Sequence, residues 1–134
     1  MAEETVVKEP LTTEMTAAGE ELMQRLDAAD FGVVAAFWLY ALEPNRWRLM
    51  LASPLVDREG PIKAYARIQA TLVKRPDAVP GLSVRNITVL SPKDPLVKKL
   101  RTVIRVGKGK RGMRFSSARV RDTFVEDSYI YRLL

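Results

Sequence analysis

Histidine and cysteine are both absent from this sequence of 134 residues. Without cysteine, the chain cannot form a disulfide, use a thiol as a nucleophile or bind zinc through sulfur. Without histidine, it lacks the commonest general base, the commonest metal ligand and the side chain that ordinarily titrates near neutral pH. These two absences exclude the most familiar catalytic and metal-binding arrangements. We therefore favour a protein that is not an enzyme, with no catalytic residues, no metal ligands and no cofactor.

Long hydrophobic runs are also lacking. The longest uninterrupted apolar stretch, VVAAFWLYAL at residues 33–42, has ten residues, whereas a membrane-spanning helix needs about 20. The first 30 residues carry eight acidic side chains against Lys8 and Arg25, which is the opposite of the basic start of a signal peptide. We expect no membrane partner and a cytoplasmic protein.

Acidic residues are missing from one part of the chain. Residues 98–121 contain ten lysines and arginines and no acid, although the net charge of the whole chain is only +6. Residues 1–30 carry a net charge of −6, from two basic and eight acidic residues.

The length of the chain is typical of one domain. We interpret residues 1–11 as a flexible acidic tail and residues 12–134 as a single domain.

Periodic hydrophobic residues predict the first elements. A helix begins after Thr12 or Thr13, which are suitable N-caps, and stops at Asp30-Phe31-Gly32. Residues 33–42 and 46–52 then form a hairpin around a turn at 43–45. The first of these strands is apolar on both faces and should be central in its sheet, while the second alternates and should have one solvated face.

The second half repeats this mixture of helices and strands. Gly60-Pro61 opens a helix, residues 83–90 form a strand, and Asp94-Pro95 starts a helix that continues to residue 106. Two further strands follow, hinged near Arg121-Asp122. The order α-β-β-α-β-α-β-β predicts an α+β fold with a mixed five-stranded sheet and helices on at least one face. The helix after Gly60-Pro61 has an apolar stripe that should be buried, formed by Ile62, Tyr65, Ile68 and Leu72 with Ala66 and Val73.

The segment GKGKRGMRFSS at 107–117 contains the spacing G-x-G-x-x-G, which in nucleotide-binding proteins cradles phosphate. Such a motif must follow a strand and open a helix, because the phosphate rests on helix N-terminal N–H groups. Here it follows a predicted helix and precedes a strand. We therefore expect Gly107 to end that helix as a left-handed C-cap glycine, and no nucleotide site.

The basic residues of the same region require a separate interpretation. A merely solvated surface normally mixes charges of both signs, so an acid-free block favours binding of nucleic acid or another polyanion. Neutralisation of a helix C-terminus and docking of the acidic N-terminal segment, in the same or a neighbouring copy, are the alternatives. The predicted polyanion-binding residues are Lys98, Lys99, Arg101, Arg105, Lys108, Lys110, Arg111 and Arg114.

Two further functions are considered. Trp38, Tyr40 and Trp47 would be the aromatic anchors of a homo-oligomer or protein–protein interface if no helix covered their face of the sheet, although burial in the core is the favoured interpretation. The least favoured function is a magnesium-dependent nuclease, because nothing in the sequence brings its candidate carboxylates together. These carboxylates are Asp57, Glu59, Glu126 and Asp127.

Overall fold

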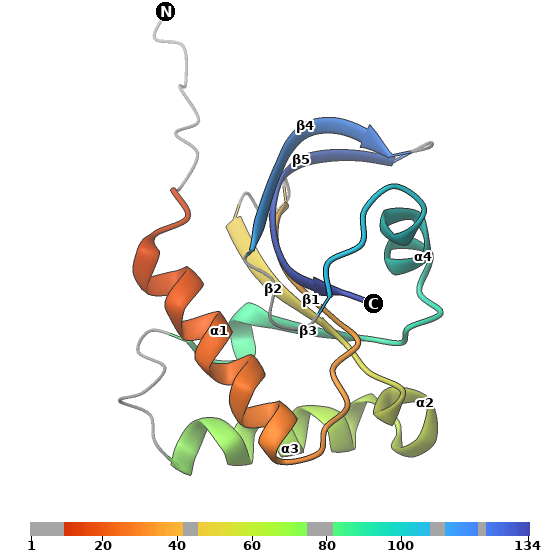
Figure 1. The fold of residues 1–134 in the computed structure, drawn as a ribbon. Coiled ribbons are helices and arrows are strands. Elements are labelled where there is room, and N and C mark those ends of the chain that lie inside the picture. Colours follow the sequence, from red (N-terminus) through yellow and green to blue (C-terminus); the bar gives the residue numbers. More distant parts are fainter. Residues whose placement is uncertain (1–9, 42–45, 75–81, 108–111, 121–122) are drawn as a thin grey trace, which may run out of the picture.

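A computed structural model describes residues 10–41, 46–74, 82–107, 112–120 and 123–134 (Figure 1). Its α-helices are α1 (Thr13–Ala28), α2 (Leu55–Glu59), α3 (Pro61–Lys74) and α4 (Pro95–Arg101), and a short 3-10 helix, η2, spans Val84–Asn86. Its strands are β1 (Ala35–Ala41), β2 (Arg46–Ala52), β3 (Ile87–Leu90), β4 (Met113–Val120) and β5 (Thr123–Leu133). The predicted α+β class and element order are confirmed, with α2 and η2 as additions. The predicted turn at 43–45, the hinge at 121–122 and residues 1–9 of the tail lie outside the described residues.

The five strands form one mixed sheet in the order β3-β2-β1-β5-β4. Strand β1 pairs antiparallel with β2 and with β5, and β5 continues antiparallel to β4. Strand β3 lies parallel to β2. The central position of β1 agrees with the prediction from its two apolar faces, since a strand flanked on both edges and covered on both faces cannot present polar side chains cheaply.

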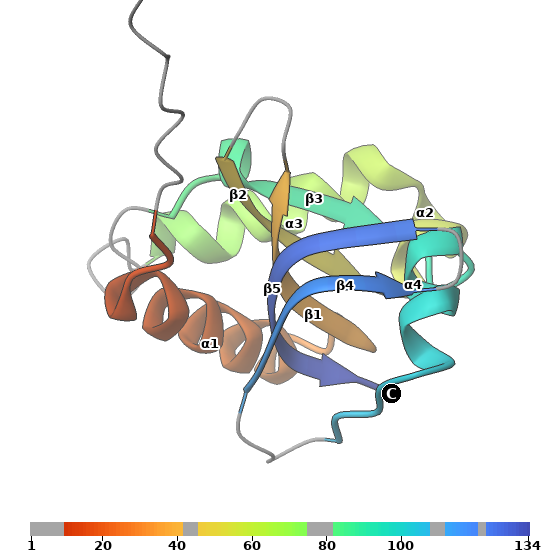
Figure 2. The same ribbon diagram turned by 90° about the horizontal axis from the view of Figure 1, so that it is seen from above.

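Helices α1 and α3 cover one face of the sheet (Figures 1 and 2). Helix α1 is capped by Thr12, whose hydroxyl accepts a hydrogen bond from the Met15 N–H at 3.1 Å, as predicted for an N-cap. The helix contributes Leu22 and Leu26 to a core that also holds Leu49 of β2 and Ile68 of α3. This core fixes the helical layer on the sheet.

Helix α4 and the β4–β5 hairpin close over the opposite face (Figure 1). Their side chains form a second core, in which Val97 of α4 and Val125 of β5 pack with Phe37 and Met50 of the central strands. Met50 is therefore buried, and the predicted solvated face of β2 is wrong at this position. The pattern of β2 could not reveal this, because the residues that cover Met50 come from much later in the chain.

Helix α4 ends at Arg101, several residues before the predicted end at 106. The residues that follow include Thr102, Val103 and Ile104, whose β-branched side chains lose rotamer freedom in a helix. Val106 then exchanges backbone hydrogen bonds with Leu133, which requires extended backbone. The predicted C-cap role of Gly107 is wrong for this reason: the C-cap is Thr102.

The buried stripe predicted for α3 is also partly wrong. Ala64, Ile68 and Leu72 face the core, but Ile62 is 84% exposed and Val73 is 60% exposed. Ile62 precedes Ala64 by two residues, which at 3.6 residues per turn places the two side chains on nearly opposite sides of the helix. Ile62 fits the apolar spacing of the sequence, but it lies on the side of α3 that faces away from the sheet.

One matched pair of substitutions tests this assignment. We expect Ile68→Val to lower the free energy of unfolding by about 1 kcal/mol, because it removes a buried methylene. The same change at Ile62 should alter it by less than about 0.5 kcal/mol. Urea denaturation followed by tryptophan fluorescence measures both. Equal losses in the two variants would contradict the exposed position of Ile62.

Candidate polyanion-binding site

The predicted basic residues fall into three groups in the structure. On α4, Lys98 is exposed, while Lys99 and Arg101 are half-buried. The Lys99 ammonium donates to the Thr123 hydroxyl at 2.9 Å, and Arg101 donates to the carbonyl of Pro92 at 3.3 Å. Arg105 follows the helix and is exposed. The second group, Lys108, Lys110 and Arg111, lies outside the described residues.

Arg114, near the start of β4, forms the third group. Its guanidinium donates two hydrogen bonds of 2.6 Å to the carboxylate of Asp127 and lies 5.4 Å from the centre of the Trp47 ring. The hydrogen bond to Asp127 raises the pKa of Arg114 above its ordinary value. Val120 comes six positions after Arg114, which is about 20 Å along a strand. Arg114 is thus paired with an acid and lies far from α4, which contacts the start of β5 through Lys99 and Thr123.

The predicted aromatic anchors lie inside the core. Trp38 is 2% exposed, Tyr40 is 4% exposed and Trp47 is 3% exposed, all within the cluster that α1 and α3 cover. The Trp38 indole N–H donates to the Tyr131 hydroxyl at 2.8 Å, so even its polar edge is engaged. In the single chain these rings offer no exposed surface of the kind that an interface needs.

The candidate carboxylates are engaged in separate contacts. Asp57 and Glu59 lie on the short helix α2, not in a loop. Asp57 accepts a hydrogen bond from the Ser91 hydroxyl at 2.8 Å, Glu59 lies 3.8 Å from Arg67, and Asp127 pairs with Arg114. Across the part of the chain that the structure describes, no three acidic side chains gather in a way that could hold a metal ion. The structure therefore offers the nuclease hypothesis no support.

A junction between α4 and the start of β5 was not predicted. The Lys99–Thr123 hydrogen bond joins the helix to the hairpin, and both views place the end of β4 and the start of β5 beside α4 (Figures 1 and 2). Arg119 of β4 is directly opposite Phe124 of β5 in the register, so their side chains share one face of the hairpin. Arg119 is exposed, and Phe124 is 52% exposed. We call Lys98, Lys99, Arg119 and Phe124 the α4–hairpin end.

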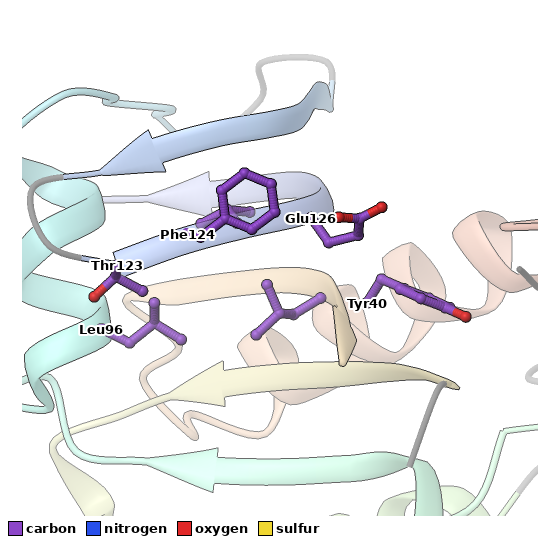
Figure 3. Close-up of a pocket in the computed structure, with 7 residues that line it drawn as sticks. Tyr40, Leu96, Thr123, Phe124 and Glu126 are labelled. Atoms are coloured by element: carbon purple, nitrogen blue, oxygen red, sulfur yellow. The ribbon is translucent and has the colours of Figure 1, made fainter. Parts of the chain in front are cut away.

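A pocket of about 350 Å³ opens beside Phe124 (Figure 3). It exists because the pairing of β1 with β5 stops at Leu39 and Ser128, whereas the first residues of β5 pair with β4. The hairpin therefore separates from the central strand at this point. The pocket is lined by Leu39, Tyr40, Leu96, Thr123, Phe124, Val125 and Glu126.

The sequence carries no local signal for this pocket. In TFVEDSYIY, Phe124 shares a strand face with Glu126, and Val125 shares the other face with Asp127. Both faces carry an acidic residue, yet Val125 and Asp127 are buried while Phe124 is 52% exposed, so the alternation does not single out Phe124. Leu39 and Leu96 could not have been joined to it, because they come from two other elements.

No protein-family model, curated protein or solved structure matches the chain. Among the described residues, no helix has the length and the apolar character needed to cross a bilayer.

Proposed function

We propose that the protein is a non-catalytic domain that binds nucleic acid or another polyanion through the α4–hairpin end. The observation that carries the proposal is the Lys99–Thr123 hydrogen bond of 2.9 Å. It holds the basic helix against the hairpin, so that cations of α4 and of β4 lie at one end of the molecule. Lys98 and Arg119 are both exposed at this end.

The chemistry favours phosphate as the ligand group. Lysine and arginine that contact phosphates release condensed counterions, and this release drives binding without any need for a preformed cavity. The acid-free segment 98–121 contains every cation of the α4–hairpin end. Arg114, in contrast, already has the carboxylate of Asp127 as its partner, so its role is assigned to the fold and not to the ligand.

Charge reversal at the two exposed cations tests the proposal. We expect Lys98→Glu with Arg119→Glu to weaken binding to heparin or to a mixed-sequence DNA duplex by at least about tenfold at low salt. We also expect the dependence of affinity on salt to become shallower, because fewer counterions are released. Fluorescence anisotropy across a salt series measures both quantities.

The matched control reverses two exposed cations of α3, Lys63 and Lys74. Both double variants lower the net charge from +6 to +2, because each reversal changes it by two units. A general effect of net charge would weaken binding equally in both. Equal weakening, or the absence of salt-dependent binding by the unaltered protein, would contradict the proposal. A mass that rises with protein concentration in both variants would instead favour a homo-oligomeric module.

A further inference from the structure

We infer that the α4–hairpin end binds single-stranded nucleic acid and that one base stacks on Phe124 at the mouth of the neighbouring pocket. This inference rests on the proposed function, because it identifies the kind of polyanion that the same cations would bind. It goes beyond charge, since it assigns roles to an exposed aromatic ring, to an apolar cavity and to a carboxylate.

The position of Phe124 is the first observation. Phe124 is about half exposed, although its chain neighbour Val125 is buried in the second core. Burial would favour the ring by the hydrophobic effect, so its exposure leaves a flat apolar surface open to a ligand. Arg119 lies directly opposite on the same face of the hairpin. A ring beside a cation suits a nucleotide, which has a π-face to stack and a phosphate to pair.

The pocket is the second observation. Its walls include Leu39 of β1 and Leu96 of α4, and Figure 3 shows Leu96 beside Thr123. Its volume of about 350 Å³ falls at the lower end of the range of about 300–1,000 Å³ for small-molecule sites, which suits a group of the size of one base. A base in a duplex is paired and stacked on both sides, so it cannot enter such a pocket without being extruded. A base of a single strand can.

The charges around the pocket orient the strand. Leu96 and Lys99 are three residues apart and lie on the same side of α4, so the Lys99 ammonium is at the α4 side of the pocket. Glu126 is at the opposite side (Figure 3), and among the described residues its carboxylate has no hydrogen bond or ion pair. A carboxylate repels phosphate but accepts hydrogen bonds from the amino group of cytosine or adenine. Phosphates are therefore directed to the cations and bases to the carboxylate.

Substitutions of Phe124 separate stacking from charge. We expect Phe124→Leu, which keeps an apolar side chain but removes the ring, to weaken binding of a labelled oligo-dC of about 16 nucleotides by about tenfold. Binding of the same variant to a DNA duplex should change by less than about twofold, since the cations remain. Phe124→Trp restores a stacking surface and should bind oligo-dC as tightly as the unaltered protein. Fluorescence anisotropy at fixed salt provides all of these affinities.

The outcomes distinguish this inference from the proposed function. Two results together would support both the polyanion site and the stacking role. The Lys98→Glu, Arg119→Glu variant would bind the duplex and oligo-dC more weakly, and Phe124→Leu would bind only oligo-dC more weakly. Unchanged oligo-dC binding by Phe124→Leu, or an equal loss for duplex and oligo-dC, would overturn the stacking role while leaving the polyanion site intact. Failure of the unaltered protein to bind either ligand would overturn both. An unchanged urea midpoint in each variant verifies that the fold is retained.

Glu126 provides an independent measurement at the same site. Thymine lacks an exocyclic amino group, so the unaltered protein should prefer oligo-dC to oligo-dT. We expect Glu126→Gln to reduce this preference, because a neutral amide is a weaker acceptor than a carboxylate. An unaltered preference in Glu126→Gln would exclude a role for this carboxylate in reading the base.

Discussion

Replacing Asp27 with alanine is expected to lower the free energy of unfolding by about 3 kcal/mol. The Asp27 carboxylate, at the end of α1, accepts hydrogen bonds of 2.8 and 2.7 Å from the guanidinium of Arg132 on β5. The Arg132 side chain is 5% exposed. Its guanidinium also donates a hydrogen bond of 3.0 Å to the carbonyl of Val33. Removing the carboxylate leaves a buried charge that lacks its counter-ion.

Two further variants make this expectation specific. Arg132→Met removes the buried guanidinium charge together with its ion pair, so it should lower the free energy of unfolding by less than Asp27→Ala does. Glu21→Ala, which breaks the 2.9 Å pair with the half-buried Arg25 within α1, should lower the free energy of unfolding by less than about 0.5 kcal/mol. Chemical denaturation of the three variants ranks the losses. A cost for Asp27→Ala as small as that for Glu21→Ala would show that the Arg132 charge is stabilised without its partner.

A glycine in the middle of α1 gives the second large effect. Gly19→Ala in a helix ordinarily stabilises a protein, because alanine loses less conformational entropy. Here a β-carbon would overlap the hydroxyl of Tyr131 and lie 3.0 Å from the indole nitrogen of Trp38. We expect the variant to be less stable by about 2 kcal/mol, since the helix must move away from the sheet. Thermal unfolding monitored by circular dichroism gives the sign as well as the size of the change.

A double-mutant cycle with Tyr131 verifies the cause. The Tyr131 hydroxyl accepts from Trp38 and donates to the carbonyl of Thr16 at 2.6 Å, and burial raises the pKa of this phenol well above its ordinary value. Tyr131→Phe alone should cost about 1–3 kcal/mol, because both partners lose a buried hydrogen bond. In this background Gly19→Ala should cost less than in the unaltered protein. Strictly additive losses would indicate that the overlap with the hydroxyl is not the source of the effect.

Much of the architecture was predictable from local signals. The N-caps at Thr12 and Asp94 and the first-turn prolines at 61 and 95 fixed where three helices begin, because capping depends on a few neighbouring residues. The bounds of β2 and the central place of β1 followed from their apolar patterns. The end of α4 was less predictable, since the bridge between Val106 and Leu133 competes with the helix and depends on a partner far along the chain.

The candidate site was predictable in composition but not in arrangement. The acid-free segment drew attention to Lys98 and Lys99, and α4 does present them. Arg114 is separated from that group by the length of β4, and its bidentate pair with Asp127 depends on the register between β4 and β5. Phe124 and its pocket depend on where β5 leaves β1. Such long-range pairings are not encoded by any local pattern.

The pairing of β1 with β5 also has a consequence for synthesis. Trp38 and Tyr131, which share a hydrogen bond across this pair, are 93 residues apart in sequence. As the chain leaves the ribosome, α1 and the β1–β2 hairpin emerge long before the strand that completes the central pair. During that interval the apolar edge of β1 is uncovered, and such edges favour association between chains. Closure of this long loop also makes folding slower than that of a protein with local contacts.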